Sequence, residues 1–117
     1  MRYSIETLLN KVNLTPDTVE FSEVMQVITD NYQYTPTRFS NGDLINEAGT
    51  NEGSCKLFAF AKLQTLSEAQ TLACFGTYYR DDVLKNPQGI DHNNIRNFIS
   101  LGWTGVLAEH LALVPKT

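Results

Sequence analysis

A cysteine and a histidine are the residues of this sequence best suited to covalent chemistry. Cys55 follows Asn51-Glu52-Gly53-Ser54 near the start of an apolar segment of helical length. A helix N-terminus lowers the pKa of a thiol because it stabilises the thiolate, and with His92 or His110 as general base Cys55 could act as a nucleophile. The alternative is a small buried hydrophobe, because Cys55 lies among Phe and Ala and no local signature of a cysteine hydrolase is present. Cys55 and His92 are therefore the catalytic candidates, although the sequence favours a protein that is not an enzyme.

Two polar segments could bind an anion or a partner. In Asp91-His92-Asn93-Asn94-Ile95-Arg96-Asn97, His92 and Arg96 share one helix face, and free N–H groups at a helix start can hold an anion. The second segment, Tyr78-Tyr79-Arg80-Asp81-Asp82, combines phenols, a guanidinium and carboxylates. The simpler interpretation of both segments is structural, with helix caps, a solvated face and internal ion pairs.

The sequence gives little support for a metal or a phosphate loop. It has two histidines and no Cys-x-x-Cys pair, and it has no Gly-rich phosphate loop and no Gly-x-Ser-x-Gly turn. Several carboxylates could hold Mg²⁺ or Ca²⁺, but they lack the spacing of a known site; they are Glu47, Glu52, Asp81, Asp82 and Asp91. We expect no metal and no cofactor.

Composition indicates one ordinary globular domain. The chain has 117 residues, of which 42% are hydrophobic and 19% charged, as is usual for a folded domain of this size. The net charge is -4 and the basic residues are scattered, which disfavours nucleic acid and anionic membranes as partners. The expected partner is an unknown protein or small molecule, and the sequence leaves the oligomeric state open.

The cysteines and the N-terminal residues bear on the cellular compartment. Cys55 and Cys74 each lie in an apolar helical segment, which predicts buried free thiols in a reducing compartment. Met1-Arg2-Tyr3-Ser4-Ile5-Glu6 lacks the pattern of a secretory signal, and no apolar run approaches the ~20 residues that span a bilayer.

Hydrophobic periodicity predicts about five helices. The first has Ser4 as its cap, the second is capped by Thr18 or Ser22, and Ser67 forms a capping box with Gln70. Asp91 is expected to cap the last helix, which ends at Gly102. The expected helices cover 5–12, 21–32, 54–63, 67–84 (continuing past Gly76) and 91–102.

A hairpin and a C-terminal strand complete the prediction. Residues 34–39 form a short edge strand because Pro36 cannot donate to a ladder, and Asn41-Gly42 is a strong hairpin-turn signal before a return strand at 43–46. Residues 103–114 alternate loosely and are expected to form a strand that pairs with this hairpin. The predicted fold class is α+β, with the helices packed on a small, mainly antiparallel sheet.

The polar segments, taken together and in order, resemble the HopJ type III effector family. The matching segments run from about residue 33 to the C-terminus, so the resemblance predicts one HopJ-like domain over residues 1–117. They are Phe39-Ser40-Asn41-Gly42, Asn46 to Lys56, Phe75-Gly76, Tyr78-Tyr79-Arg80, Asn86-Pro87, Asp91-His92 and Asn94-Ile95-Arg96-Asn97-Phe98 to Trp103. The resemblance implies an α/β domain of uncharacterised activity, a bacterial cytoplasmic origin and translocation by type III secretion.

Three functional hypotheses follow. The first is a non-enzymatic interaction module in which eight polar residues converge on one surface: Glu47, Asn51, Glu52, Tyr79, Arg80, His92, Asn94 and Arg96. The second is a small enzyme or ligand-binding domain, using Cys55 with His92 or a pocket of Glu52, His92 and Arg96 for an anion or metal. The third is that these residues are caps and turns that specify the fold.

Overall fold

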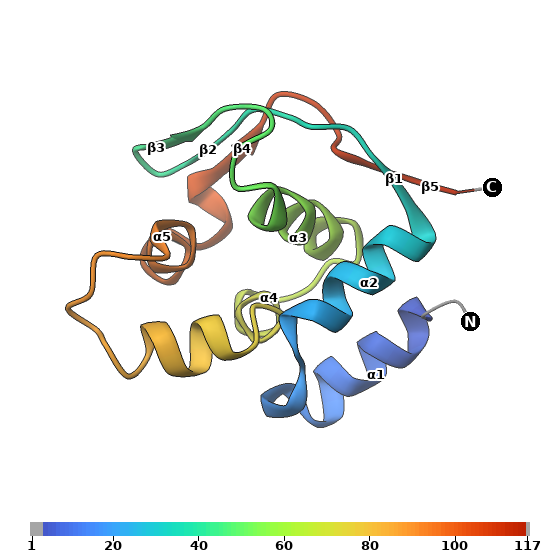
Figure 1. Cartoon of the computed structure of the whole chain (residues 1–117), viewed down its shortest axis with the longest axis horizontal. Helices are drawn as coiled ribbons and strands as arrows, with labels where there is room; N and C mark the ends of the chain where they lie inside the picture. The colour runs from blue at the N-terminus through green and yellow to red at the C-terminus, as the bar shows by residue number, and fades with distance from the viewer. Residues whose placement is uncertain (1–3, 117) are drawn as a thin grey trace.

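The computed structural model describes residues 4–116. One of its five α-helices is central and largely buried, the other four pack around it, and two small antiparallel sheets lie along one side (Figure 1). The helices are α1 (Ile5–Leu14), α2 (Phe21–Asn31), α3 (Glu52–Leu63), α4 (Glu68–Ala73) and α5 (Asn93–Leu101). Shorter turns of helix are the 3-10 helices Pro16–Thr18 and Gly102–Gly105 and the π-helix Tyr78–Val83. The predicted α+β fold class is confirmed.

The strands form two separate sheets. Their bounds are β1 (Tyr32–Tyr34), β2 (Phe39–Asn41), β3 (Leu44–Asn46), β4 (Val106–Ala108) and β5 (Leu113–Pro115). One sheet has the order β3-β2-β4, and β1 pairs with β5 in the other. A hairpin is confirmed as β2 and β3, but its two turn residues are Gly42, at φ +61°, and Asp43, because Asn41 is the last residue of β2 and pairs with Leu44.

The single C-terminal strand predicted for 103–114 is wrong in extent. Its first part, Val106–Ala108, pairs with the hairpin as expected, but Leu113–Pro115 pairs with β1. Trp103 lies in a 3-10 helix, and the chain bends between β4 and β5. Similarly, residues 34–39 are divided between β1 and β2 around Pro36, which has no N–H to give to a ladder.

Helix α3 is the centre of the hydrophobic core. It carries five buried side chains: Cys55, Leu57, Phe58, Phe60 and Ala61. The ring of Phe58 meets those of Phe39, Phe75, Phe98 and Trp103 at centroid distances of 5.1 to 6.1 Å. This aromatic cluster joins α3 to the hairpin and to α5, so it fixes the elements that line both hollows described below.

The predicted helix starts are partly confirmed. Ser4 caps α1 and Ser67 forms its capping box with Gln70. Helix α2 is instead capped by Glu20, whose side chain and that of Glu23 form a reciprocal capping box, and not by Thr18 or Ser22.

The other two helices also begin differently from the prediction. Helix α3 begins at Glu52, two residues before Ser54, and α5 begins after His92 and not after Asp91. In both cases the capping residue, Asn51 or His92, adopts the left-handed conformation, which periodicity alone does not reveal.

The long helix predicted for 67–84 is interrupted. Helix α4 ends at Ala73, and Gly76 at φ +63° precedes the π-helix. A Cβ on Gly76 would lie 2.8 Å from the backbone nitrogen of Phe21, so this position requires glycine both for its conformation and for the close approach of α2.

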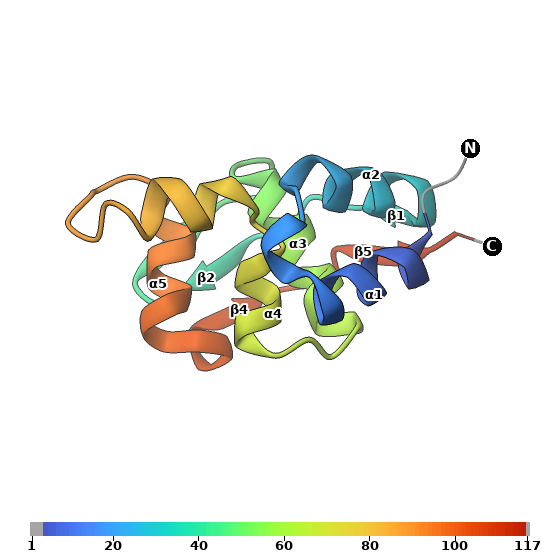
Figure 2. The same ribbon diagram turned by 90° about the horizontal axis from the view of Figure 1, so that it is seen from below.

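The molecule is flattened, with principal extents of 40 × 32 × 20 Å, and the β1–β5 pair lies at the end that also holds both chain termini (Figure 2). Met1 to Tyr3 and Thr117 lie outside the described residues. The prediction that Met1–Glu6 is not a secretory signal and the 1–117 bounds of the predicted domain therefore lie partly outside them. Within the described part, none of the helices has the length and apolar character needed to cross a membrane. Cys55 and Cys74 are both buried and free, as predicted.

Candidate functional site

Three of the eight predicted binding residues line one polar hollow. Asn51, His92 and Asn94 lie where the starts of α3 and α5 meet, around a hollow of about 310 Å³. The remaining lining residues are Leu44, Ser54, Asn93 and Ile95. The structure therefore brings together part of the predicted constellation, at the ends of two helices that are 41 residues apart in the sequence, from Glu52 to Asn93.

Both helix starts at this hollow have an unusual backbone. Asn51 (φ 48°) and His92 (φ 52°) occupy the N-cap positions in the left-handed conformation, and within residues 4–116 neither side chain closes its helix with a capping hydrogen bond. A non-glycine residue in this conformation costs on the order of 1 kcal/mol or more. The first N–H groups of both helices are left for water or another acceptor.

A network of four asparagines, of which Asn41, Asn46 and Asn94 are buried, holds these two helix starts to the hairpin. Asn94 Nδ2 donates to Asn46 Oδ1 at 2.9 Å, and Asn46 Nδ2 donates back to Asn94 Oδ1 at 3.2 Å. Asn51 Nδ2 donates to Asn46 Oδ1 at 2.7 Å, and Asn41 Nδ2 donates to the backbone oxygen of Asn94 at 2.8 Å. The amides of Asn51 and Asn94 are thus engaged in holding the fold.

Asn41 and Asn46 belong to this network, although the sequence pattern does not predict it. Both are almost fully buried, at 0% and 1% exposure. One signal in the sequence could have identified them. Both asparagines lie in the predicted hairpin, on either side of its turn, and asparagine is a poor strand former. Asn41 was interpreted only as a turn residue.

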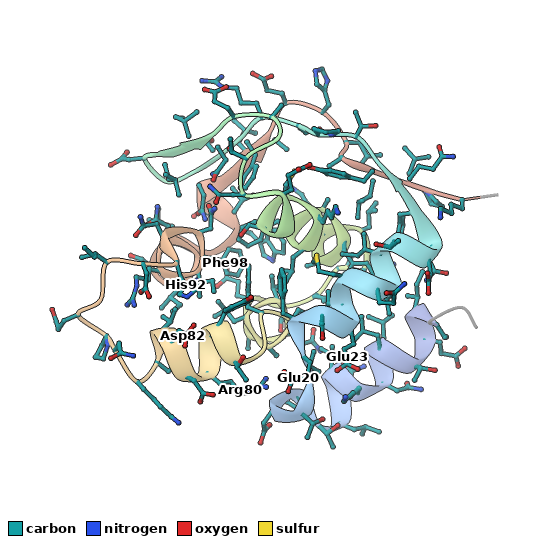
Figure 3. The ribbon with its side chains drawn as sticks, viewed as in Figure 1. Glu20, Glu23, Arg80, Asp82, His92 and Phe98 are labelled. Atoms are coloured by element: carbon teal, nitrogen blue, oxygen red, sulfur yellow. The ribbon has the colours of Figure 1, made fainter. Side chains whose placement is uncertain are left out.

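His92 faces carboxylates at the edge of the polar hollow. Its Nε2 lies 3.1 Å from Asp82 Oδ2 and 3.8 Å from Asp91 Oδ2, and its ring lies 5.3 Å from that of Tyr78. Figure 3 shows His92 and Asp82 on facing elements, the start of α5 and the π-helix. This contact ties the π-helix to α5.

The two predicted arginines serve the fold at other places. Arg80 Nη1 donates to the backbone oxygen of Val19 at 2.9 Å, and Arg80 Nη2 lies 3.5 Å from Glu20 Oε1 (Figure 3). Arg96 Nη2 donates to Asp91 Oδ1 at 2.8 Å, and its Nη1 donates to the backbone oxygen of Asn86 at 2.9 Å. The Arg96 guanidinium holds the pKa of the Asp91 carboxyl below its ordinary value.

The other three predicted binding residues are dispersed. Glu47 Oε1 lies 3.2 Å from Arg38 Nε. Glu52 stands in the first turn of α3. Burial raises the pKa of the Tyr34 hydroxyl, and Glu52 raises it further. Tyr79 packs against the hydrophobic core. The eight residues therefore do not form one continuous surface.

Cys55 and His92 have different partners and line different hollows. The Cys55 thiol donates to the backbone oxygen of Thr37 at 3.6 Å, and burial raises its pKa. This direction is opposite to the lowering that a helix start alone would produce. Among residues 4–116 we find no group of three or more His, Cys, Asp or Glu side chains arranged to hold a metal ion.

A larger, apolar groove lies on the other side of Cys55. It has a volume of about 420 Å³ and separates α3 from the segment 106–112. Phe58 and Trp103 contribute to its lining, and Leu63, Leu107 and Leu111 are 40%, 74% and 59% exposed along it. We call this feature the apolar groove; its full lining is Phe39, Cys55, Phe58, Ala59, Lys62, Leu63, Trp103 and residues 106–112.

The apolar groove has no counterpart among the features that the sequence predicts. The loose alternation of apolar residues over 103–114 predicts a strand, and such alternation normally places one set of side chains in a core. In the structure the chain bends after β4, so Leu107 and Leu111 stay at the surface beside α3.

Comparison with known proteins gives a family and a close structural relative. The model of the HopJ type III effector protein family matches residues 5–113. The crystal structure of VPA0580, described as a protein of unknown function, superimposes with a TM-score of 0.98 at 46% sequence identity. The match covers 99% of this chain and 97% of that one. No curated protein matches the sequence significantly.

Proposed function

The chain belongs to the HopJ type III effector protein family, and from this premise we propose that it is a non-enzymatic interaction module. Its docking surface is the apolar groove, and its partner is a protein that presents an apolar segment. The observation that carries the proposal is the groove itself, in which large apolar side chains remain exposed next to a rigid helix. Contiguous exposed apolar surface of this kind marks interaction sites in soluble domains.

The cysteine geometry supports an interaction role over catalysis. A nucleophilic cysteine needs a lowered pKa and a base within hydrogen-bond reach. Burial raises the pKa of Cys55, and the ring nitrogen of His92 is directed to Asp82. His110 lines the same groove as Cys55, but the Cys55 thiol donates to the backbone oxygen of Thr37 and not to His110. Cys55 instead forms part of the wall of the apolar groove.

The proposal extends to the place of action. Two buried free thiols suit a reducing compartment, so we propose that the protein acts in the bacterial cytoplasm. The alternative, which the family description suggests, is delivery out of the cell through a type III secretion system. Cell fractionation separates the two, because delivery requires the protein to reach the medium in wild-type cells and to stay inside cells that lack the secretion system.

Selection of peptide ligands tests the docking surface. Random peptides displayed on phage are selected on the purified chain, and the selected peptides are then measured against Ala59→Arg. Ala59 lines the groove between Cys55 and Lys62 on α3, so an arginine there fills the groove while its charged end reaches solvent. We expect Ala59→Arg to weaken binding roughly tenfold or more, as the loss of a buried hot-spot contact does.

The matched control is Ala69→Arg. Ala69 is exposed on α4 and lies outside the apolar groove, so this variant adds the same side chain without filling the docking surface. Peptides that bind wild type, Ala69→Arg and Ala59→Arg equally well would show that the apolar groove is not the docking surface.

A further inference from the structure

Strand β4 lies at the edge of its sheet. The sheet order is β3-β2-β4, so β4 has a hydrogen-bonded neighbour on one side only. Exposed edges of this kind can accept a further strand from another chain. The question is which backbone groups of β4 remain open and what lies beside them.

The register shows which groups are open. Gly42 N–H donates to the Gly105 oxygen, and Glu109 N–H donates to the Arg38 oxygen. Because bonded pairs alternate along an antiparallel ladder, Leu107 is the residue of β4 whose N–H and C=O both bond to β2, opposite Ser40.

The neighbours of Leu107 therefore direct their backbone groups away from β2. The Val106 N–H bonds to the Trp103 oxygen, which leaves the carbonyl of Val106 and both the N–H and the C=O of Ala108 on the outer edge. The hairpin agrees with this alternation. Asn41 and Leu44 flank the two-residue turn as a hydrogen-bonded pair, so the backbone groups of Ser40 point away from β3 and toward Leu107.

The open edge borders the apolar groove. Val106, Leu107 and Ala108 all line it, although successive side chains of a strand point to opposite faces. A hollow reached by three successive strand residues lies along the edge of the strand, where the backbone is accessible. The groove is thus bounded by the open edge of β4 on one side and by α3 on the other.

We infer that the bound segment is an extended strand that pairs with the outer edge of β4 and directs alternate apolar side chains toward Phe58 and Trp103. This inference rests on the proposed function. Lys62 stands on the α3 wall of the groove and has no ion-pair partner among the described residues, so the fitting partner also carries a carboxylate. The partner is therefore an extended protein segment with apolar residues at every second position and an acidic residue between them.

A second copy of this chain fits the edge poorly. An incoming strand has to lie between β4 and α3, but the β4 of a second copy is itself backed by its own α3 and Trp103. A free segment, such as a tail or a long loop of another protein, has no such backing and can enter the groove.

A synthetic peptide tests strand addition directly. The probe is acetyl-Thr-Val-Asp-Val-Thr-Val-Thr-amide, compared with two versions that are N-methylated either on the Val amides or on the intervening Asp and Thr amides. Alternate amides of a strand lie on opposite edges, so only one methylated version blocks the edge that meets β4. We expect that version to bind roughly tenfold more weakly, and the other to bind like the unmethylated peptide.

Amide hydrogen exchange gives an independent readout on the protein. Bound peptide should slow exchange at Ala108, whose N–H becomes paired, and leave Leu107 nearly unchanged because its N–H already bonds to β2. Equal binding of both methylated peptides, equal weakening of both, or unchanged exchange at Ala108 would overturn strand addition while leaving the groove as a docking surface.

Two further outcomes are distinguishable from these. Failure of the unmethylated peptide to bind overturns strand addition alone, and the proposed function fails only if peptides selected on the chain bind wild type and Ala59→Arg equally well. A dimer of the free chain in sedimentation, with exchange at Ala108 that slows as protein concentration rises, would make the occupant a second copy and overturn the inference that it is a segment of another protein.

Discussion

Asn46 on β3 and Asn94 on α5 exchange side-chain hydrogen bonds in both directions, at 2.9 and 3.2 Å. Both residues are buried, and the pair joins the hairpin to the helix start that borders the polar hollow. A buried amide pair of this kind stabilises the fold only while both members are present, because a lone buried amide keeps its desolvation penalty. The pair therefore provides a direct measure of how far this polar cluster is structural.

Replacement of Asn94 by alanine should destabilise the protein strongly. Asn46 would lose two of its hydrogen bonds and Asn41 would lose the side-chain oxygen that it reaches at 3.0 Å. We expect the free energy of unfolding in urea to fall by about 2–4 kcal/mol, since each buried group left unpaired costs about 1–3 kcal/mol. Asn10→Ala is the matched control, because Asn10 is exposed on α1; equal effects of the two substitutions would contradict a structural role for the network.

Replacement of Gly102 by alanine should also destabilise the fold, through two separate effects. Gly102 has φ +62°, and a Cβ there would clash with the carboxylate of Glu68, which accepts the backbone N–H of Trp103 at 3.1 Å. We expect a loss of about 2–3 kcal/mol from the strained backbone and the displaced hydrogen bond.

Gly49→Ala separates these two effects. Gly49 also has positive φ (+89°), but a Cβ there would meet nothing within 4 Å, so only the backbone strain of about 1 kcal/mol applies. Thermal or urea unfolding of both variants provides the comparison. If Gly49→Ala is as damaging as Gly102→Ala, the carboxylate of Glu68 makes no specific contribution.

Several elements of the fold could be predicted from sequence because their cause is local. The Ser67–Gln70 capping box, the hairpin turn at Gly42 and the first cap at Ser4 each involve residues a few positions apart. The polar residues could be identified as unusual, but not assigned to the hairpin network, because Asn46 and Asn94 meet only after the chain has folded.

The apolar groove could not be predicted for a related reason. The alternating residues of 103–114 have the same pattern whether they line a core or an open groove, and the decision depends on the bend between β4 and β5. The left-handed caps at Asn51 and His92 likewise leave no trace in the hydrophobic periodicity. What sequence could not provide is therefore the set of long-range contacts that define both hollows.

Stability should decline at high pH because of Cys74. Burial, with a smaller effect of Glu23, raises the pKa of the Cys74 thiol to about 12, from 9.0 in the unfolded chain. A raised pKa in the folded state stabilises the fold fully below the unfolded value, and this contribution is lost as pH rises from about 9 toward 12. The slope attributable to one such group reaches about 1.4 kcal/mol per pH unit.

Cys74→Ala should remove that part of the slope. The measurement is the free energy of unfolding in urea at several values between pH 8 and about 11, for wild type and Cys74→Ala. Comparison of slopes avoids the constant cost of the small cavity that alanine leaves. Parallel curves for the two proteins would show that Cys74 does not ionise on unfolding.

Cys55 should be slow to react in the folded protein. Burial raises the pKa of its thiol, and only the thiolate is nucleophilic, so alkylation by iodoacetamide should have a midpoint above the ordinary value of 9.0. His92→Ala should leave the midpoint unchanged, because His92 lies against Asp82. Alkylation of each cysteine mapped by mass spectrometry provides the test; a midpoint below the ordinary value that shifts in His92→Ala would favour an enzyme.

Arg96 should act as an internal clamp and not as a ligand-binding residue. Its guanidinium bonds to the side chain and backbone oxygen of Asp91 and to the backbone oxygen of Asn86, so it ties the loop 86–91 to α5. Lysine keeps the charge but cannot reproduce this planar set of donors. We expect Arg96→Lys to lower the free energy of unfolding by about 1–2 kcal/mol and to speed proteolysis within 86–91, while peptide binding at the apolar groove stays unchanged.

Lys85→Arg is a suitable control, because Lys85 forms an exposed ion pair with Asp81 next to the same loop. If Arg96→Lys weakened peptide binding without loosening the loop, Arg96 would belong to the binding surface, as the sequence first suggested.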